Sequence, residues 1–89
     1  MKAIVSVFAK DAKGIIAYIT GVLAEQEINI LDISQTLMQE YFTMIMLVDL
    51  TDCPMSFDAL SRYLQEKGEA RGLSVHIQRQ DIFDAMHRI

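Results

Sequence analysis

The sequence predicts an α+β domain in which two helices cover one face of a four-stranded antiparallel sheet. Apolar segments of strand length alternate with two longer segments whose apolar residues recur at helical spacing. Their order is strand, helix, strand, strand, helix, strand, which is the split βαβ pattern. A chain of 89 residues has room for one domain, which we expect over residues 1–89.

The first predicted strand, Lys2–Ala9, is apolar on both faces, as expected of a strand at the centre of a sheet. A polar break over residues 10–14 separates it from the first helix, which ends in the polar residues 25–27. Gly14 stands where this helix begins, and a glycine there allows close backbone approach. The apolar stripe of the helix comprises Ile15, Ile16, Ile19, Val22 and Leu23.

The second and third strands are predicted to form a hairpin. Asn29–Gln39 alternates only in part, and Ile30 interrupts the alternation, which indicates a bulge near the start of this strand. Glu40 and Tyr41 form the tight connection to the third strand, which covers residues 42–50.

The second helix begins after Ser56, a favourable N-cap residue, and ends near Gly72, a favourable C-cap residue. Residues 73–78 then alternate as a half-buried strand. A C-terminal extension over about residues 80–89 is expected to form a short helix. Its apolar residues are Ile82, Phe83, Met86 and Ile89.

The first and third strands are apolar on both faces, although the helices cover only one. The second face receives Ile4 and Phe8 from the first strand and Ile45 and Leu47 from the third. Burying about five such side chains is worth more than roughly 10 kcal/mol at about 25 cal/mol per Å². We therefore expect a second copy, the C-terminal extension or both to cover this face. Single exposed apolar residues, which are common on protein surfaces, are the alternative.

The charge balance argues against two kinds of partner. Eight basic and twelve acidic residues give a net charge of −4, which is the wrong sign for nucleic acid or an anionic membrane. Neither a signal peptide nor an apolar run long enough to span a membrane is found. The single cysteine, Cys53, excludes an internal disulfide and fits a cytoplasmic location.

No catalytic, metal or cofactor site is predicted. Cys53 has no basic neighbour in sequence, and the positions of His76 and His87 do not match metal-ligand spacing. The chain also lacks the glycine-rich loops that bind nucleotide phosphates. A small enzyme or an RNA-binding module of the same topology stays open as a weaker alternative.

The loop before the first helix has features of a ligand site. The N–H groups at the start of a helix attract a small carboxylate. Asp11 offers an acceptor for an ammonium group, and Asn29 offers both a donor and an acceptor, so together they suit an α-amino acid. Alternatively, Asp11 only shapes the turn, Gly14 lets the helix pack, and Asn29 ends a turn with a positive φ.

The run from Ile4 to Leu50 resembles the ACT domain family. The resemblance is carried by D-x-x-G at residues 11–14, L-A-E-Q-E at residues 23–27 and I-N-I-L-D-I-S-Q at residues 28–35. It extends over essentially the whole chain and is strongest toward small stand-alone bacterial and archaeal members. The chain is also similar to the ACT portions of the glycine cleavage system's transcriptional regulator and of formyltetrahydrofolate deformylase.

The resemblance implies a ferredoxin-like βαββαβ fold that pairs with another copy and regulates by binding an amino acid at the interface. Lys13 departs from the Pro that many members carry, and Ala9 departs from a polar residue that others use on the ligand. Some members bind nothing and serve only as pairing surfaces, so a ligand-free module that contacts itself or another protein is the alternative. The implied ligand-binding residues are Asp11, Ala12, Lys13, Gly14, Ile15, Asn29 and Ile30.

Overall fold

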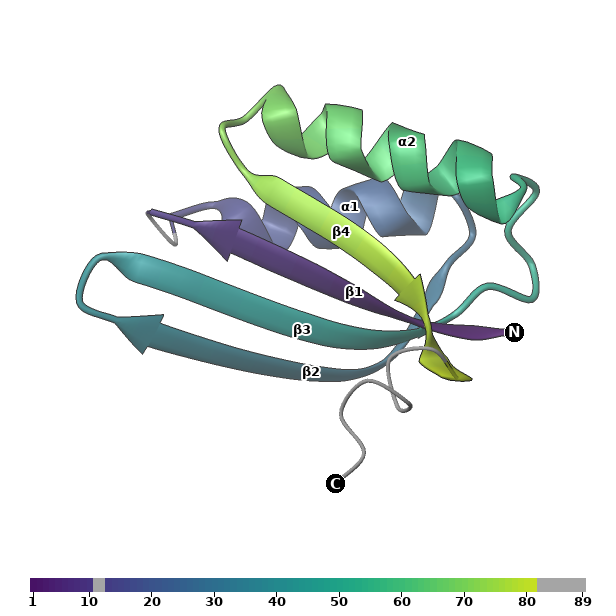
Figure 1. Cartoon of the computed structure of the whole chain (residues 1–89), viewed down its shortest axis with the longest axis horizontal. Helices are drawn as coiled ribbons and strands as arrows, with labels where there is room; N and C mark the ends of the chain where they lie inside the picture. The colour runs from purple at the N-terminus through teal and green to yellow at the C-terminus, as the bar shows by residue number, and fades with distance from the viewer. Residues whose placement is uncertain (11–12, 82–89) are drawn as a thin grey trace.

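The computed structural model describes residues 1–10 and 13–81 and has the predicted βαββαβ topology (Figure 1). Its antiparallel sheet has the strand order β2-β3-β1-β4, and both helices lie on one side of it. Of the predicted C-terminal helix, Gln80 and Asp81 are described and helical, whereas the remainder lies outside the described residues. The elements are β1 (Lys2–Ala9), α1 (Ile15–Glu25), β2 (Asn29–Met38), β3 (Tyr41–Asp49), α2 (Phe57–Glu69) and β4 (Ser74–Arg79).

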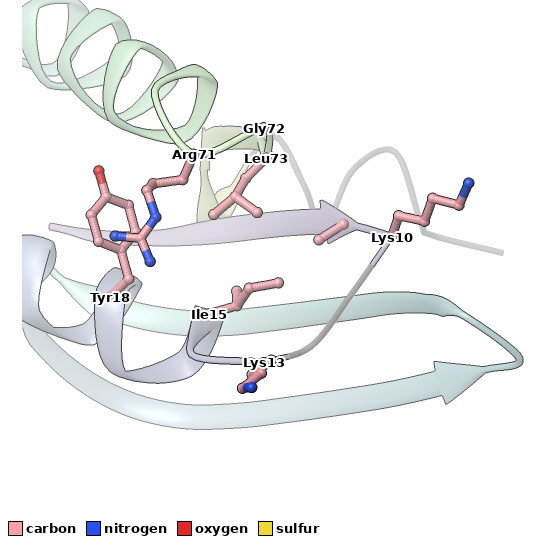
Figure 2. Close-up of a pocket in the computed structure, with 8 residues that line it drawn as sticks. Lys10, Lys13, Ile15, Tyr18, Arg71, Gly72 and Leu73 are labelled. Atoms are coloured by element: carbon pink, nitrogen blue, oxygen red, sulfur yellow. The ribbon is translucent and has the colours of Figure 1, made fainter.

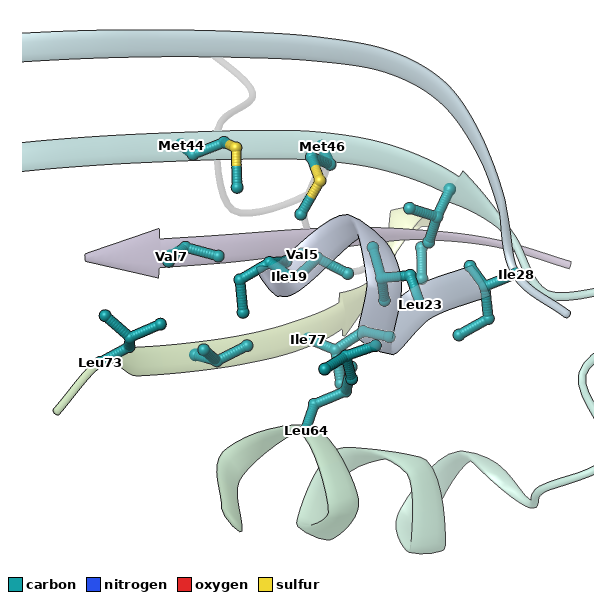
Figure 3. Packing of buried hydrophobic residues seen from close by; sticks show 14 of the residues in the cluster. Val5, Val7, Ile19, Leu23, Ile28, Met44, Met46, Leu64, Leu73 and Ile77 are labelled. Atoms are coloured by element: carbon teal, nitrogen blue, oxygen red, sulfur yellow. The ribbon is translucent and has the colours of Figure 1, made fainter. Parts of the chain in front are cut away.

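The hydrophobic core fills the space between the sheet and the helices (Figure 3). Although β3 is apolar on both faces, its residues from Phe42 to Val48 are buried only at every second position, on the side that faces the helices. Helix α1 buries the apolar stripe that the sequence indicates, although Ile16 is exposed. The side chains buried most completely are Ile19, Leu23, Met44, Met46, Leu60, Leu64, Val5, Val7, Val48 and Val75.

The strand register confirms the bulge in β2 and shifts the hairpin turn by one residue. The pairing of β2 with β3 slips between Ile30 and Asp32, as the broken alternation predicts. Met38 pairs with Tyr41, so the connection is Gln39–Glu40 and not the predicted Glu40–Tyr41. Gln39 has a φ of 56°, and two-residue hairpin turns require a positive φ at their first central position.

The helix ends are stabilised at the predicted residues with one exception. The Ser56 hydroxyl accepts a hydrogen bond from the Ala59 backbone N–H at 3.3 Å, as expected of an N-cap. Gly72 follows α2 with a φ of 72°, which confirms its role as a C-cap. After α1, the positive φ of 58° belongs to Glu27 and not to Asn29, so the alternative in which Asn29 ends the turn with a positive φ is wrong.

The apolar second face of the sheet is exposed only in part. Phe8 and Ile45 are 47% and 37% exposed, but Ile4 is only 9% exposed and Leu47 is half-buried. Met38 and Tyr41 add to the exposed apolar area of this face, because they pair with each other and Tyr41 alternates in phase with Ile45 along β3. Further exposed large apolar residues lie along the edge strand β2. They are Leu31, Ile33 and Leu37.

Candidate functional site

The predicted ligand loop joins the end of β1 to the start of α1. Lys13 and Gly14 are exposed in this loop, whereas the Ile15 side chain is buried. Gly14 has a φ of 74°, and a Cβ atom there would meet no atom within 4 Å. The glycine is therefore needed for its positive φ rather than for the close packing that the sequence suggested. Asp11 and Ala12 lie outside the described residues.

The N-terminus of α1 has no side-chain cap. Gly14 has no side chain to accept a hydrogen bond, and the first turn contains no acidic residue. The first helical hydrogen bond that involves Gly14 runs from the Tyr18 N–H to the Gly14 carbonyl oxygen at 3.1 Å. The N–H groups that precede Tyr18 thus lack a partner from within the helix, and they leave a partial positive charge at this end.

A cavity of about 290 Å³ lies between the first turn of α1 and the turn that joins α2 to β4 (Figure 2). Its apolar wall includes Ile15 and Leu73, and its polar lining comes from basic side chains. Because α2 contacts β4, the cavity is on the β4 side of α1, away from the edge strand β2. The lining residues are Ala9, Lys10, Lys13, Ile15, Tyr18, Arg71, Gly72 and Leu73.

Arg71 is held over an aromatic ring at one side of this cavity (Figure 2). The carbon of its guanidinium group is 4.4 Å from the centroid of the Tyr18 ring, a cation–π contact. The Tyr18 hydroxyl donates a hydrogen bond to the Lys67 carbonyl oxygen at 2.8 Å, which fixes the ring between the two helices. Arg71 therefore has a defined position although its side chain is exposed.

The two parts of the predicted ligand site lie at opposite ends of the sheet in one chain. Asn29 is paired with Asp49, and Asp49 with Lys2, so Asn29 stands at the beginning of β1. Gly14 follows the far end of that eight-residue strand. At about 3.3 Å per residue, the strand separates Asn29 and Ile30 from the loop by roughly 25 Å. One chain therefore does not bring all the predicted residues together.

Helix α1 has an unusual exposed face. Its eleven residues include one charged residue, Glu25, in the last turn. A helix without a charged face is normally buried on all sides. Because α2 contacts β4 and also α1, helix α1 occupies the side of the sheet that is nearer to β2. The uncharged residues exposed on α1 are Ile16, Ala17, Gly21 and Ala24.

The neighbouring edge strand β2 extends this uncharged surface. Ile33 and Leu37 are paired with Met46 and Phe42, so they point to the helix side of the sheet. They are nevertheless 40% and 63% exposed, because neither helix reaches over the edge strand. We call the exposed residues of α1 and the helix-side residues of β2 the pairing surface: Ile16, Ala17, Gly21, Ala24, Ile33 and Leu37.

The surroundings of Cys53 and His76 favour a structural role for each of them. Cys53 packs partly buried against the core, and His76 is exposed and hydrogen-bonded to the Ser74 hydroxyl at 2.9 Å. Within residues 1–10 and 13–81, no three His, Cys, Asp or Glu side chains are grouped so that they could hold a metal ion. Neither α1 nor α2 has the length and apolar character that a membrane-spanning helix requires.

The fold and the loop together define a small ferredoxin-like regulatory module. A family model described as "ACT domain" matches residues 2–78, and the chain belongs to this family of regulatory, small-ligand-binding modules. The chain is 56% identical to a UPF0237 protein of Clostridium acetobutylicum over the full length of both. It is also 49% identical to a UPF0237 protein of Methanocaldococcus jannaschii, with 99% of this chain and 98% of the relative aligned.

Solved structures agree with this assignment. An ACT domain protein from Streptococcus pneumoniae superposes with a TM-score of 0.85 and 42% identity, covering 97% of each chain. A formyltetrahydrofolate deformylase from Pseudomonas putida matches with a TM-score of 0.78 and 16% identity, covering 91% of this chain and 29% of that one. The second match shows a common fold and nothing more, because its identity is low.

The sequence patterns were not used to predict two features, the uncharged exposed face of α1 and the contact between Arg71 and Tyr18. The absence of charge on α1 is visible in its sequence, because a helix with one solvent-facing side normally carries charged residues there. The stacking of Arg71 on Tyr18 joins residues 53 positions apart, and no periodic pattern in the sequence signals such a contact.

Proposed function

We propose that this protein is a non-catalytic regulatory module that pairs with a second copy and binds a small amino acid between the two copies. The observation that carries the proposal is the uncharged pairing surface on α1 and β2. Regulation through a bound small molecule is the role of the family to which the chain belongs. A cytoplasmic location fits the single cysteine.

The pairing would join β2 of one copy to β2 of the other. One edge of the ten-residue strand β2 has no neighbouring strand, and such an edge readily accepts another strand, although the Ile33 N–H already donates to the Asp32 carboxylate at 2.9 Å. Two-fold symmetry requires the same surface on both copies, and it places the two β2 strands antiparallel. The α1 helices then meet through small residues such as Ala17 and Gly21, which permit close approach.

This arrangement supplies the residue that the loop lacks. When two β2 strands run antiparallel, the start of one strand lies beside the end of the other. The end of β2 is the end of the sheet that carries Gly14 and Ile15. The partner's Asn29 would therefore stand near the start of α1, and each pair of copies would hold two equivalent sites.

The chemistry of that junction suits an amino acid. The uncapped start of α1 favours the carboxylate of the ligand. The amide oxygen of the partner's Asn29 would accept a hydrogen bond from the ammonium group, with Asp11 as a further acceptor. Lys13, Ile15 and the partner's Ile30 would enclose the small side chain, and Ala12 would contribute backbone alone.

Calorimetric titration with the common amino acids tests the ligand. We expect at least one to bind at millimolar concentration or below, and Asn29→Ala to weaken that binding by about tenfold or more. Gln65→Ala, on the exposed side of α2, is the matched control and should bind normally. If no amino acid binds at millimolar concentration, the ligand proposal is wrong.

Sedimentation equilibrium tests the pairing independently. Gly21→Lys adds a charge to the centre of the pairing surface at a position where a Cβ atom meets nothing within 4 Å. The isolated fold should tolerate it, because Lys favours the helix over Gly by about 0.7 kcal/mol. We expect wild type and Gln65→Lys to be dimers at tens of micromolar and Gly21→Lys to be a monomer. A monomeric wild-type protein would contradict the proposal.

A ligand-free pairing module is the second candidate. The apolar exposure of Leu37 and Ile33 favours it, because that surface needs a partner whether or not a ligand is present. Its signature is a stable dimer that binds none of the amino acids.

A further inference from the structure

The cavity on the β4 side of α1 borders the loop of the proposed amino acid site and is also lined by Tyr18, Arg71 and Leu73, which that site does not use. Its apolar part is formed by side chains of Ala9, Ile15 and Leu73 together with the Tyr18 ring. These residues come from β1, α1 and the α2–β4 turn of one chain, so the cavity is complete without a second copy. Its volume of about 290 Å³ fits a molecule with a short branched aliphatic body.

The charged residues in the described lining of the cavity are all basic. Three of the eight basic residues of the chain, Lys10, Lys13 and Arg71, are among the described lining residues, and no acidic residue is. This gathering of positive charge is notable in a chain with a net charge of −4. Figure 2 shows Lys10 and Lys13 extending away from Arg71, so they add to the electrostatic field rather than to a common contact.

Arg71 is the residue best placed to bind an anion directly. Stacking on Tyr18 occupies the flat face of the guanidinium group and leaves its N–H edges for hydrogen bonds. The ion pairs found among the described residues involve Met1, Asp49, Arg79 and Asp81 but not Arg71. A guanidinium group held in this way is suited to a carboxylate, which it binds through two parallel hydrogen bonds.

We propose that this cavity binds a small aliphatic carboxylate that lacks an ammonium group, such as a branched-chain 2-oxo acid. The aliphatic body lies against Ile15 and Leu73, and the carboxylate accepts hydrogen bonds from Arg71. A zwitterionic amino acid of the same size is disfavoured, because its ammonium group would lie beside the Arg71 guanidinium, which is positively charged and offers no acceptor. The uncapped start of α1 adds to the attraction for the anion.

The test is a titration of the ¹⁵N-labelled protein followed by NMR. The probes are 4-methyl-2-oxopentanoate, leucine, which has the same aliphatic body, and inorganic phosphate, which has none. We expect the oxo acid to shift the amide signals of Ile15, Tyr18 and Gly72 and to bind at least about tenfold more tightly than leucine. Phosphate should bind more weakly still, because it gains nothing from the apolar wall.

Substitutions separate Arg71 from general charge effects. Arg71→Gln should weaken binding of the oxo acid by about tenfold, and Arg71→Lys, which keeps the charge but not the paired donors, should lie between it and wild type. Arg62→Gln, the matched control, removes an exposed arginine of α2 outside the cavity and should have no effect. Unchanged dispersion of the amide signals verifies that each variant is folded.

The two proposals fail in different ways. Monomeric Gly21→Lys and Asn29→Ala should both bind the oxo acid as wild type does, because the cavity belongs to one chain. Equal binding of leucine and the oxo acid at Ile15, Tyr18 and Gly72 contradicts the present proposal, as does normal binding by Arg71→Gln. Phosphate binding as tight as that of the oxo acid also contradicts it, since the apolar wall would then play no part.

Discussion

At the scale of single residues, Glu27 occupies a position that favours glycine. The Glu27 N–H donates to the Ala24 carbonyl oxygen at 3.0 Å, and the Ile28 N–H donates to that of Leu23 at 3.1 Å. These two bonds form a Schellman motif, which requires a positive φ at the first residue after the C-cap, here Glu27. The same motif after α2 has Gly72 at the equivalent position. The chain therefore contains a glycine-capped and a glutamate-capped version of one helix ending.

Glu27→Gly should raise the free energy of unfolding by about 0.5–1 kcal/mol, because glycine adopts the positive φ without steric cost. Urea unfolding at one protein concentration measures the change. Glu25→Gly removes the same charge from the last turn of α1 and should lower the free energy by about 1 kcal/mol. Equal effects of the two substitutions would show that charge and not backbone conformation dominates.

Asp49 makes the free energy of unfolding depend on pH. The Thr51 hydroxyl donates to its carboxylate at 2.6 Å and the Thr51 N–H at 3.0 Å, and these bonds lower the pKa of Asp49. Because the folded state favours the ionised form, this contribution is present above the unfolded pKa of about 3.9 and is lost as the pH falls through the folded pKa.

The stability difference between wild type and Asp49→Asn should therefore be larger at neutral pH than below about pH 3. Chemical unfolding of both proteins across this range measures it. In proteins that also carry Thr51→Val, which removes the hydroxyl donor, the stability difference caused by Asp49→Asn should be smaller. A difference that does not vary with pH would mean that the Asp49 carboxylate makes no net contribution.

At the scale of elements, α2 lies so close to β4 that only glycine fits between them. A Cβ atom on Gly68 would be 2.6 Å from Cγ2 of Val75 and 3.1 Å from the Leu73 carbonyl oxygen. Helix propensity alone favours alanine here, because Gly68 is within the last turn of α2. The requirement comes from a strand seven residues further along the chain.

Gly68→Ala should lower the free energy of unfolding by about 1–3 kcal/mol despite the better helix propensity of alanine. Adding Val75→Ala removes the methyl group that clashes. The double-mutant cycle should then give a coupling of at least about 0.5 kcal/mol between the two sites. Gln65→Ala in the same helix should be neutral. Additive effects of Gly68→Ala and Val75→Ala would contradict the proposed close approach.

At the scale of the whole molecule, the proposed amino acid site would depend on two copies, and this has a consequence that can be tested. A protein with Asn29→Ala keeps an intact loop, and a protein with Gly14→Asn keeps an intact Asn29. Asn tolerates the positive φ at position 14, while its side chain enters the space of the ligand carboxylate. Each variant alone would lack a complete site, because both sites of its own dimer carry the defect.

Mixing the two variants, followed by unfolding and refolding, should restore amino acid binding to about a quarter of the sites. Half of the dimers are then mixed, and in each of these one site combines the intact loop with the intact Asn29. Calorimetry gives the number of binding sites directly. Failure of the mixture to bind, with both variants dimeric, would mean that loop and Asn29 do not act across the interface.

The order of the elements, the bulge in β2 and the caps at Ser56 and Gly72 were all predictable from the sequence. These features depend on local backbone preferences and on apolar periodicity, both of which are properties of adjacent residues. The hairpin turn was placed one residue too late, because neither Gln39 nor Glu40 is a typical turn residue. The loop before Gly14 was also recognisable, since its sequence pattern is local.

The tertiary structure decided which surfaces and cavities these elements create. It left Phe8, Ile45 and Tyr41 exposed on the second face of the sheet, which the sequence indicated to be apolar, and added an exposed apolar surface on β2 and α1, because the sheet order makes β2 an edge that no helix covers. It separated Asn29 from Gly14 by the length of a strand, and it stacked Arg71 on Tyr18. Such relations depend on the relative placement of elements distant in sequence, which packing sets and local sequence patterns do not encode.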